Sequence, residues 1–139
     1  MVKICILEDY FKETIERYSA ILPCDVDGKP RPEYSHEVHL IFDSVVVPPR
    51  FRGSGIQSLV RRGVNPRNIH FDFDYVPIDA AIYFSDWLKG QCFKLAERLG
   101  RDKLYVFPAN RQIREKAQQR GLKILDRPVE EIVAALEGK

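Results

Sequence analysis

The sequence predicts a single α/β domain with a mixed β-sheet flanked by helices. Strand-like and helical segments alternate from residue 69 to residue 136, as they do in layered α/β proteins. The chain has 139 residues, a usual length for one domain. Its hydrophobic content of 45% and charged content of 30% are those of an ordinary globular protein. We therefore expect residues 1–139 to form one domain with a substantial core.

The N-terminal half contains two predicted strands. The first is an apolar run over residues 2–7, and an apolar stripe at helical spacing follows over 10–21. Asp27-Gly28 is a strong turn signal. The best strand of the chain covers residues 37–47, because its first part alternates apolar and polar side chains and its second part is apolar throughout.

The C-terminal half is read by the same periodicities. Prolines and glycines at the borders of the segments help to set the limits of each element. The predicted elements are a short helix over 56–62, a strand over 69–76, a long helix from 77–79 to about 99, a strand over 104–107, a helix over 111–120, a strand over 122–125 and a helix over 129–136. Trp87 lies on the long predicted helix, and we expect its side chain in the protein core or at the interface of a homodimer.

Net charge, cysteine content and apolar run length indicate which partners and which cellular location to expect. A net charge of +2 is too small to indicate a nucleic-acid partner by itself. Cys5, Cys24 and Cys92 are odd in number and lack the spacing of a metal site, which predicts reduced thiols in a cytoplasmic protein. No apolar stretch has the length of a membrane span, and Glu8-Asp9 interrupts the first apolar run. We expect a cytoplasmic protein without a membrane partner.

Residues 45–56 predict a phosphate-binding loop. A β-branched strand end is stopped by two prolines, and an Arg/Gly-rich turn and a helical pattern follow. A strand, a glycine turn and a helix start aim backbone N–H groups at one place, where phosphate binds. Gly53 and Gly55 allow close approach, while Arg50 and Arg52 add charge and fork-shaped donors.

The segment Arg50-Phe51-Arg52-Gly53-Ser54-Gly55 resembles the pyrophosphate loop of the Gcn5-related N-acetyltransferase (GNAT) superfamily, Gln/Arg-x-x-Gly-x-Gly/Ala, at every fixed position. The flanking strand, the proline and Ile56 agree with the motif as well. The order of predicted elements over residues 1–60, and again from 104 to 122, is similar to that family. The resemblance implies a GNAT-like fold and an acyltransferase that moves an acetyl group from acetyl-CoA to a small-molecule or peptide amine.

The resemblance also implies residue roles. Glu37 and His39 are the candidate general bases, because they project to one face of the predicted central strand and a histidine titrates near neutral pH. The family's acid, a tyrosine, has no counterpart in residues 111–120. The implied acetyl-CoA-binding residues are Val46, Val47, Arg50, Phe51, Arg52, Gly53, Ser54, Gly55 and Ile56.

Two other functions stay open. Gly63 and Pro66 break the helix after the loop, and a helix replaces the family's C-terminal strand pair, so a GNAT-like binding module without catalysis is one alternative. The other is a metal-dependent nuclease or phosphoesterase, because the order of the C-terminal elements resembles PIN-like and Toprim-like domains. Only this second alternative involves nucleic acid.

The metal-dependent alternative starts from Asp72 and Asp74. On a strand their carboxylates project from one face about 7 Å apart, an arrangement that can hold Mg²⁺. Glu8 or Asp9, after the first strand, and Asp79, at a helix start, would complete that site. The phosphate-contacting edge would then be formed by Arg61, Arg62 and Arg67.

Overall fold

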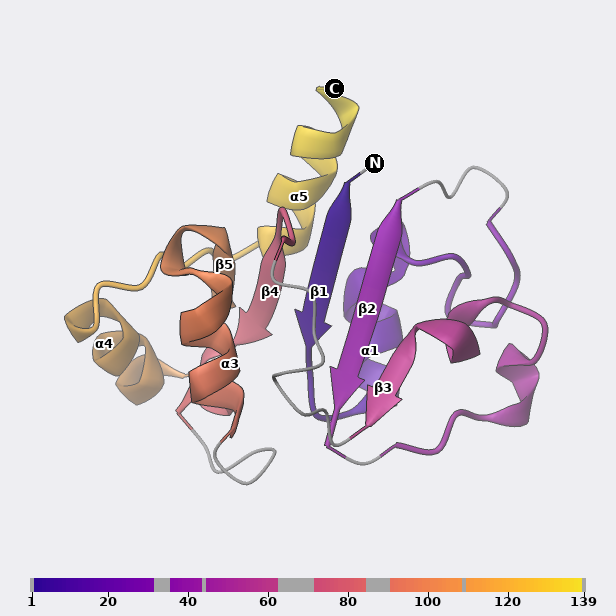
Figure 1. Cartoon of the computed structure of the whole chain (residues 1–139), viewed down its shortest axis with the longest axis horizontal. Coiled ribbons are helices and arrows are strands. Elements are labelled where there is room, and N and C mark those ends of the chain that lie inside the picture. Colours follow the sequence, from indigo (N-terminus) through magenta and orange to yellow (C-terminus); the bar gives the residue numbers. More distant parts are fainter. Residues whose placement is uncertain are drawn as a thin grey trace.

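A five-stranded parallel sheet forms the centre of the protein (Figure 1). The computed structural model describes residues 2–31, 36–43, 45–62, 72–84, 91–108 and 110–138. The strands are β1 (Lys3–Leu7), β2 (Glu37–Phe42), β3 (Val60–Arg62), β4 (Val76–Asp79) and β5 (Leu104–Phe107). Their order is β3-β2-β1-β4-β5, and all four pairings between them are parallel.

This arrangement confirms the α/β class but corrects the predicted mixed sheet. The segment between β1 and β2 carries the chain back to the amino end of the sheet, so that β2 runs in the same direction as β1. The connection between β2 and β3 does the same. Strand direction therefore follows from the connections, which the periodicity of each strand does not reveal.

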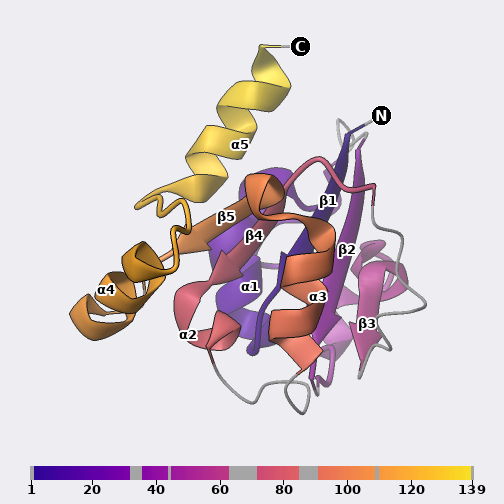
Figure 2. The same ribbon diagram turned by 60° about the vertical axis from the view of Figure 1, so that its left-hand side comes forward.

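Helices cover both faces of the sheet (Figures 1 and 2). They are α1 (Phe11–Tyr18), α2 (Ala80–Tyr83), α3 (Gln91–Leu99), α4 (Arg111–Gln119) and α5 (Pro128–Glu137). α1 and α5 contribute to the core on one face, and α2, α3 and α4 contribute to the core on the other. Within the described ranges, no helix combines the length and apolar character needed to cross a bilayer.

β1 separates the two cores. Ile4 and Ile6 pack on the α1 side, whereas Cys5 and Leu7 pack on the α3 side, and all four side chains are fully buried. A strand buried on both faces is typical of a central position in a parallel sheet. The first predicted strand is thus confirmed, and it occupies the centre of the sheet.

Two predicted elements near β2 are wrong in extent or type. The strand predicted over 37–47 ends at Phe42, because Phe42 forms the last register pair with β3. The helix predicted over 56–62 is a short 3-10 helix, Ile56–Leu59, followed by β3. Pairing of Val60 with Leu40 draws the chain into the sheet before an α-helix can form.

The predicted strand over 69–76 and the long helix after it are also corrected. Residues 69–71 lie outside the described part, Tyr75 forms a single bridge with Ile4, and β4 then runs through Pro77 to Asp79. The long helix is represented by α2 and α3, and the residues between 84 and 91, Trp87 among them, lie outside the described part. Pro77, at the predicted helix start, instead lies within β4, whose pairing with β1 has one register pair.

The last elements agree better with their sequence patterns. β5, α4 and α5 confirm the predicted strand and helices to within one or two residues. The strand predicted over 122–125 is reduced to one bridge between Ile124 and Val106. Local periodicity was sufficient for these elements, whereas a strand at the margin of the sheet depends on its partner.

The turn at Gly28 fixes the position of the Arg/Gly-rich loop. Gly28 has a φ of +87°, and a Cβ atom at this position would lie 2.5 Å from the carbonyl oxygen of Arg50. The turn is closed by Asp25, whose carboxylate accepts hydrogen bonds from the backbone N–H groups of Asp27 and Lys29 at 2.9 Å. A glycine is therefore required where this turn meets the loop.

We expect Gly28→Ala to lower the free energy of unfolding by at least about 2 kcal/mol, through backbone strain and the clash with Arg50. Gly53→Ala is the matched control, because Gly53 has a φ of +77° but nothing within 4 Å of the added Cβ. It should cost about 1 kcal/mol. Urea denaturation measures both values, and equal costs would show that the Arg50 contact is unimportant.

Candidate functional site

The carboxyl ends of β1 and β4 define the candidate site. From β1 the chain continues to β2 and β3 on one side of the sheet, and β4 and β5 lie on the other side. In open parallel sheets, ligands bind in the crevice outside the carboxyl ends of the strands at such a switch point. The side chains that emerge there are consequently the first candidates for function.

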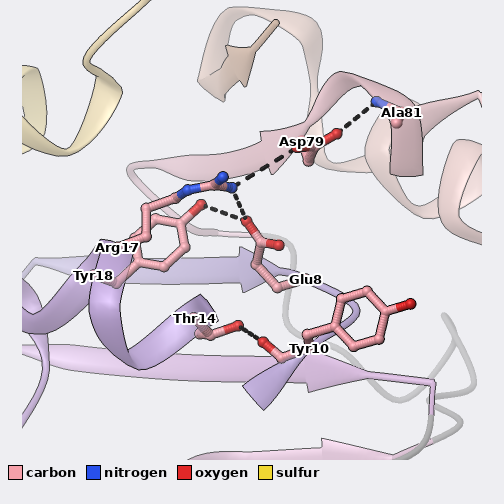
Figure 3. Close-up of polar contacts among 7 residues, drawn as sticks. All are labelled: Glu8, Tyr10, Thr14, Arg17, Tyr18, Asp79 and Ala81. Carbon is pink, nitrogen blue, oxygen red and sulfur yellow. Dashed lines mark hydrogen bonds and ion pairs between the residues drawn. The ribbon is translucent and has the colours of Figure 1, made fainter. Parts of the chain in front are cut away.

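Three elements bring charged side chains to this point (Figure 3). Glu8 follows β1 and continues its alternation toward the α1 side. Arg17 comes from the last turn of α1. Asp79 ends β4 and is the N-cap of α2, where its Oδ1 accepts a hydrogen bond from the N–H of Ala81 at 2.7 Å. The cap orients the Asp79 carboxylate.

Arg17 joins the two carboxylates. Its Nη1 donates to Oε1 of Glu8 at 2.8 Å and lies 3.8 Å from Oδ2 of Asp79. The hydroxyl of Tyr18 donates to the same Glu8 oxygen at 3.1 Å. The Glu8 side chain is 3% exposed, compared with 19% for Asp79 and 35% for Arg17. The cluster thus extends from the interior toward solvent.

Burial dominates the electrostatics of Glu8. It raises the pKa of this carboxyl to about 7, and the nearby Asp79 acts in the same direction. The charge of Arg17 and the hydrogen bond from Tyr18 oppose this rise without cancelling it. Burial also raises the pKa of Tyr18. A strongly shifted carboxyl at a switch point is characteristic of a functional site.

A solvent-open cleft of about 390 Å³ adjoins the cluster. Arg17 forms part of its wall, and the guanidinium carbon of Arg17 lies 4.5 Å from the centre of the Phe107 ring. The cleft is lined by Arg17, Phe107, Pro108, Asp126, Arg127 and Glu130, among others. Arg17 is therefore common to the carboxylate pair and to the cleft.

The predicted cofactor-binding loop, residues 50–55, packs against α1 through Phe51. Four of its backbone N–H groups, counting that of Ile56, donate to acceptors within residues 48–54. The N–H groups of Phe51 and Arg52 donate to Pro48 and Pro49, and that of Ser54 donates to Phe51. The N–H of Ile56 donates to the Ser54 hydroxyl. Gly53 and Gly55 have the positive φ expected of them. The four N–H groups are consequently occupied within the loop.

The loop side chains divide into a buried and an exposed set. The Phe51 ring packs edge-on against Phe11 at 5.1 Å, whereas the Val46 side chain is 83% exposed. Arg50 and Arg52 are exposed, and Val47 is partly buried. Since β2 ends at Phe42, neither Val46 nor Val47 belongs to a strand that a pantetheine arm would join.

The predicted bases lie at the amino end of the sheet. Nε2 of His39 is 2.7 Å from Oε1 of Glu37, and this hydrogen bond lowers the pKa of Glu37. The His39 ring meets Phe73 edge-on at 5.2 Å. The two residues do share a face, but they lie at the end of the sheet opposite Glu8 and Asp79.

Asp72 and Asp74 also lie at the amino end. Asp72 forms an ion pair with Nζ of Lys3 at 2.7 Å. Asp74 accepts a hydrogen bond from the backbone N–H of Lys3 at 2.9 Å. Glu8 and Asp79 therefore do not complete a site with them. Arg61 is exposed on β3, and Arg67 lies outside the described residues.

Within the described ranges, no three His, Cys, Asp or Glu side chains are grouped as a metal site. Glu8 and Asp79 are among the acidic candidates of the sequence, whereas Arg17 and Tyr18 are not. These two residues end α1, nine and ten residues after Glu8, and only the packing of α1 against the end of β1 brings them to it.

Comparison with known proteins gives no match to a family model, to a curated protein or to a solved structure.

We expect the stability of the protein to fall as the pH rises from about 5 to 8. The folded protein holds the Glu8 proton more tightly than the unfolded chain, whose carboxyl has a pKa near 4.5, so deprotonation favours unfolding. This group alone contributes about 3 kcal/mol over that interval. Urea denaturation should show that Glu8→Gln gains stability relative to the wild type as pH rises. A difference independent of pH would contradict the shifted pKa.

Proposed function

We propose that the protein is a metal-dependent phosphoesterase whose site is the carboxyl-end cluster of Glu8, Arg17 and Asp79. The observation that carries the proposal is that one guanidinium nitrogen lies within ion-pair distance of both carboxylates. The two acidic groups thus face a common position, which the Arg17 guanidinium holds and which a metal ion would have to take over. This site replaces the one predicted from Asp72 and Asp74, which lie beside Lys3 at the amino end of the sheet, away from the switch point.

Displacement of Arg17 by Mg²⁺ would leave two carboxylates for the metal ion and would free the guanidinium for a phosphate. Mg²⁺ is commonly held by one or two carboxylates together with substrate phosphate and water, and Glu8 and Asp79 provide two. The bound cation would polarise the phosphoryl oxygen and neutralise its charge. Arg17, with its fork of donors, would bind the phosphate oxygens from the cleft side. Tyr18 holds the Glu8 carboxylate in place through its hydroxyl.

The test is hydrolysis of p-nitrophenyl phosphate with Mg²⁺ or Mn²⁺. Asp79→Asn should lower the rate at least about 100-fold by removing a cation ligand, while asparagine preserves the N-cap of α2. Asp74→Asn is the matched change at the opposite end of the sheet and should leave the rate unchanged. Loss of activity in Asp74→Asn alone would move the site to the amino end, and absence of any metal-dependent hydrolysis would reject the proposal.

A groove beside the Arg/Gly-rich loop favours a second candidate, acyl-CoA binding by a GNAT-like domain. The groove has a volume of about 320 Å³, and its lining combines apolar side chains such as Phe11 and Phe51 with Lys12, Arg50 and one acid, Glu16. Apolar surface together with two cations suits an acyl-pantetheine arm and its phosphates. Because four of the loop N–H groups are occupied within the loop, side chains would carry much of the phosphate binding.

Calorimetric titration with acetyl-CoA tests this second candidate. Binding should weaken about 10-fold in Arg50→Ala, since a charged hydrogen bond to phosphate is lost, and should be unchanged in Arg111→Ala, an exposed arginine on α4. Binding with acetyl transfer that is lost in His39→Ala would support the acyltransferase, and binding without transfer would support the inactive module. No binding at millimolar ligand would exclude both.

A further inference from the structure

We infer that α4 and the segment after it, residues 111–127, bind the sugar-phosphate backbone of a double-stranded nucleic acid. The inference goes beyond the proposed hydrolysis and does not depend on it. Its starting point is the distribution of charge along the chain. Residues 111–127 contain six Lys and Arg but two Asp and Glu, a net charge of +4, whereas the rest of the chain sums to −2 because the whole chain has +2. Such a basic surface attracts polyanions even when the net charge of the protein is small.

The cations of this basic surface reach solvent. Figures 1 and 2 both place α4 at the outer margin of the molecule, beyond β5. Its apolar residues Ile113 and Ala117 pack in the core with α2 and α3, which leaves the charged side chains on the outside. The cations with exposed side chains are Arg111, Arg114, Lys116, Arg120, Lys123 and Arg127.

The ion pairs on this surface leave the cations available for phosphate. They join Arg111 to Glu115 at 3.3 Å, Arg114 to Asp126 at 3.1 Å and Arg127 to Glu130 at 3.5 Å. Pairs between exposed side chains contribute little to stability. A phosphate oxygen can therefore replace the carboxylate at each guanidinium, whose fork of donors matches phosphate geometry.

Cations on both flanks of α4 favour a duplex over a single strand. Arg114 reaches Asp126, in the segment after α4. Because an α-helix turns by about 100° per residue, Lys116 lies on the opposite flank, where its Nζ is 4.6 Å from the centre of the Phe84 ring. A helix with its side chains is about 10–12 Å wide, and the major groove of DNA, with phosphates along both edges, is about 12 Å wide. The two flanks can thus contact two rows of phosphates.

The absence of apolar anchors on this surface argues against a membrane or a protein partner. Among the described residues, the large hydrophobic side chains that are exposed are Tyr10, Val26 and Val46, and all three lie outside residues 111–127. A basic helix that binds a membrane also inserts apolar side chains, and a stable protein interface buries aromatic or apolar residues at its centre. Phosphate contacts require neither.

Fluorescence anisotropy with labelled 16-base-pair DNA and RNA duplexes, and with their single strands, tests the inference. At least one duplex should bind more tightly than the single strands, with an association constant that falls steeply with salt. Arg114→Gln combined with Lys116→Gln removes one cation from each flank. This double variant should weaken duplex binding at least about 10-fold at 100 mM salt and reduce the slope of log K against log salt by about 2.

The matched control is Lys12→Gln combined with Arg52→Gln, which removes the same charge from exposed positions on α1 and the Arg/Gly-rich loop. It should change duplex affinity by less than about 2-fold, because these residues lie outside the basic surface. If the flank variant does not fold, Arg111→Gln replaces it, since that side chain is 91% exposed, and should reduce the salt slope by about 1.

No salt-dependent binding of either duplex would overturn the inference, and so would equal losses in the flank and control variants. Single strands, phosphatidylserine vesicles or polyglutamate bound as tightly as the duplexes would overturn it as well. A preference for the DNA or the RNA duplex supports it and identifies the source of the backbone. Hydrolysis of p-nitrophenyl phosphate and its loss in Asp79→Asn are measured separately, so either proposal can fail while the other stands.

Discussion

The burial of β1 on both faces is the constraint on which the rest of the structure depends. Its four central side chains, from Ile4 to Leu7, are excluded from water, so the strand requires a neighbour on each edge and a helical layer on each face. β2 and β4 supply the neighbours, while α1 and α3 contribute to the two layers. Because the connections depart from β1 and β4 toward opposite edges, the same arrangement creates the crevice at the carboxyl ends.

The residue directly after this buried strand is charged, and that placement is costly. Removing the Glu8 carboxylate from water is offset only in part by Arg17 and Tyr18, as its raised pKa indicates. A hydrophobic residue would fill the position more stably. The presence of an acid, an arginine and a second acid at one strand end is consequently better explained by ligand chemistry than by stability. This is why we propose the function there rather than at the amino end, where the Lys3 ammonium pairs with Asp72 and its backbone N–H binds Asp74.

Much of the secondary structure was predictable, because it depends on local periodicity. For β5 and α4, the apolar periodicity of their own residues was enough to predict the type and the limits of the element. Strand direction, the strand character of Pro77 and the contact between Glu8 and Asp79 were not predictable, since each depends on the order of strands in the sheet. The Arg/Gly-rich loop shows what a sequence motif does not predict. The positive φ of Gly53 follows from residue type, whereas the direction of the neighbouring N–H groups depends on the bonds that the loop makes with itself.

The short edge strand β3 has a consequence for solubility during folding. An exposed strand edge invites a second chain to extend the sheet. Here the edge is three residues long, and the Arg61 guanidinium donates to the carbonyl oxygens of Ser58 and Val60 at 2.8 and 3.2 Å. An incoming strand would have to displace these bonds and remove the arginine from water. The side chain therefore acts as a gatekeeper that keeps the parallel sheet finite.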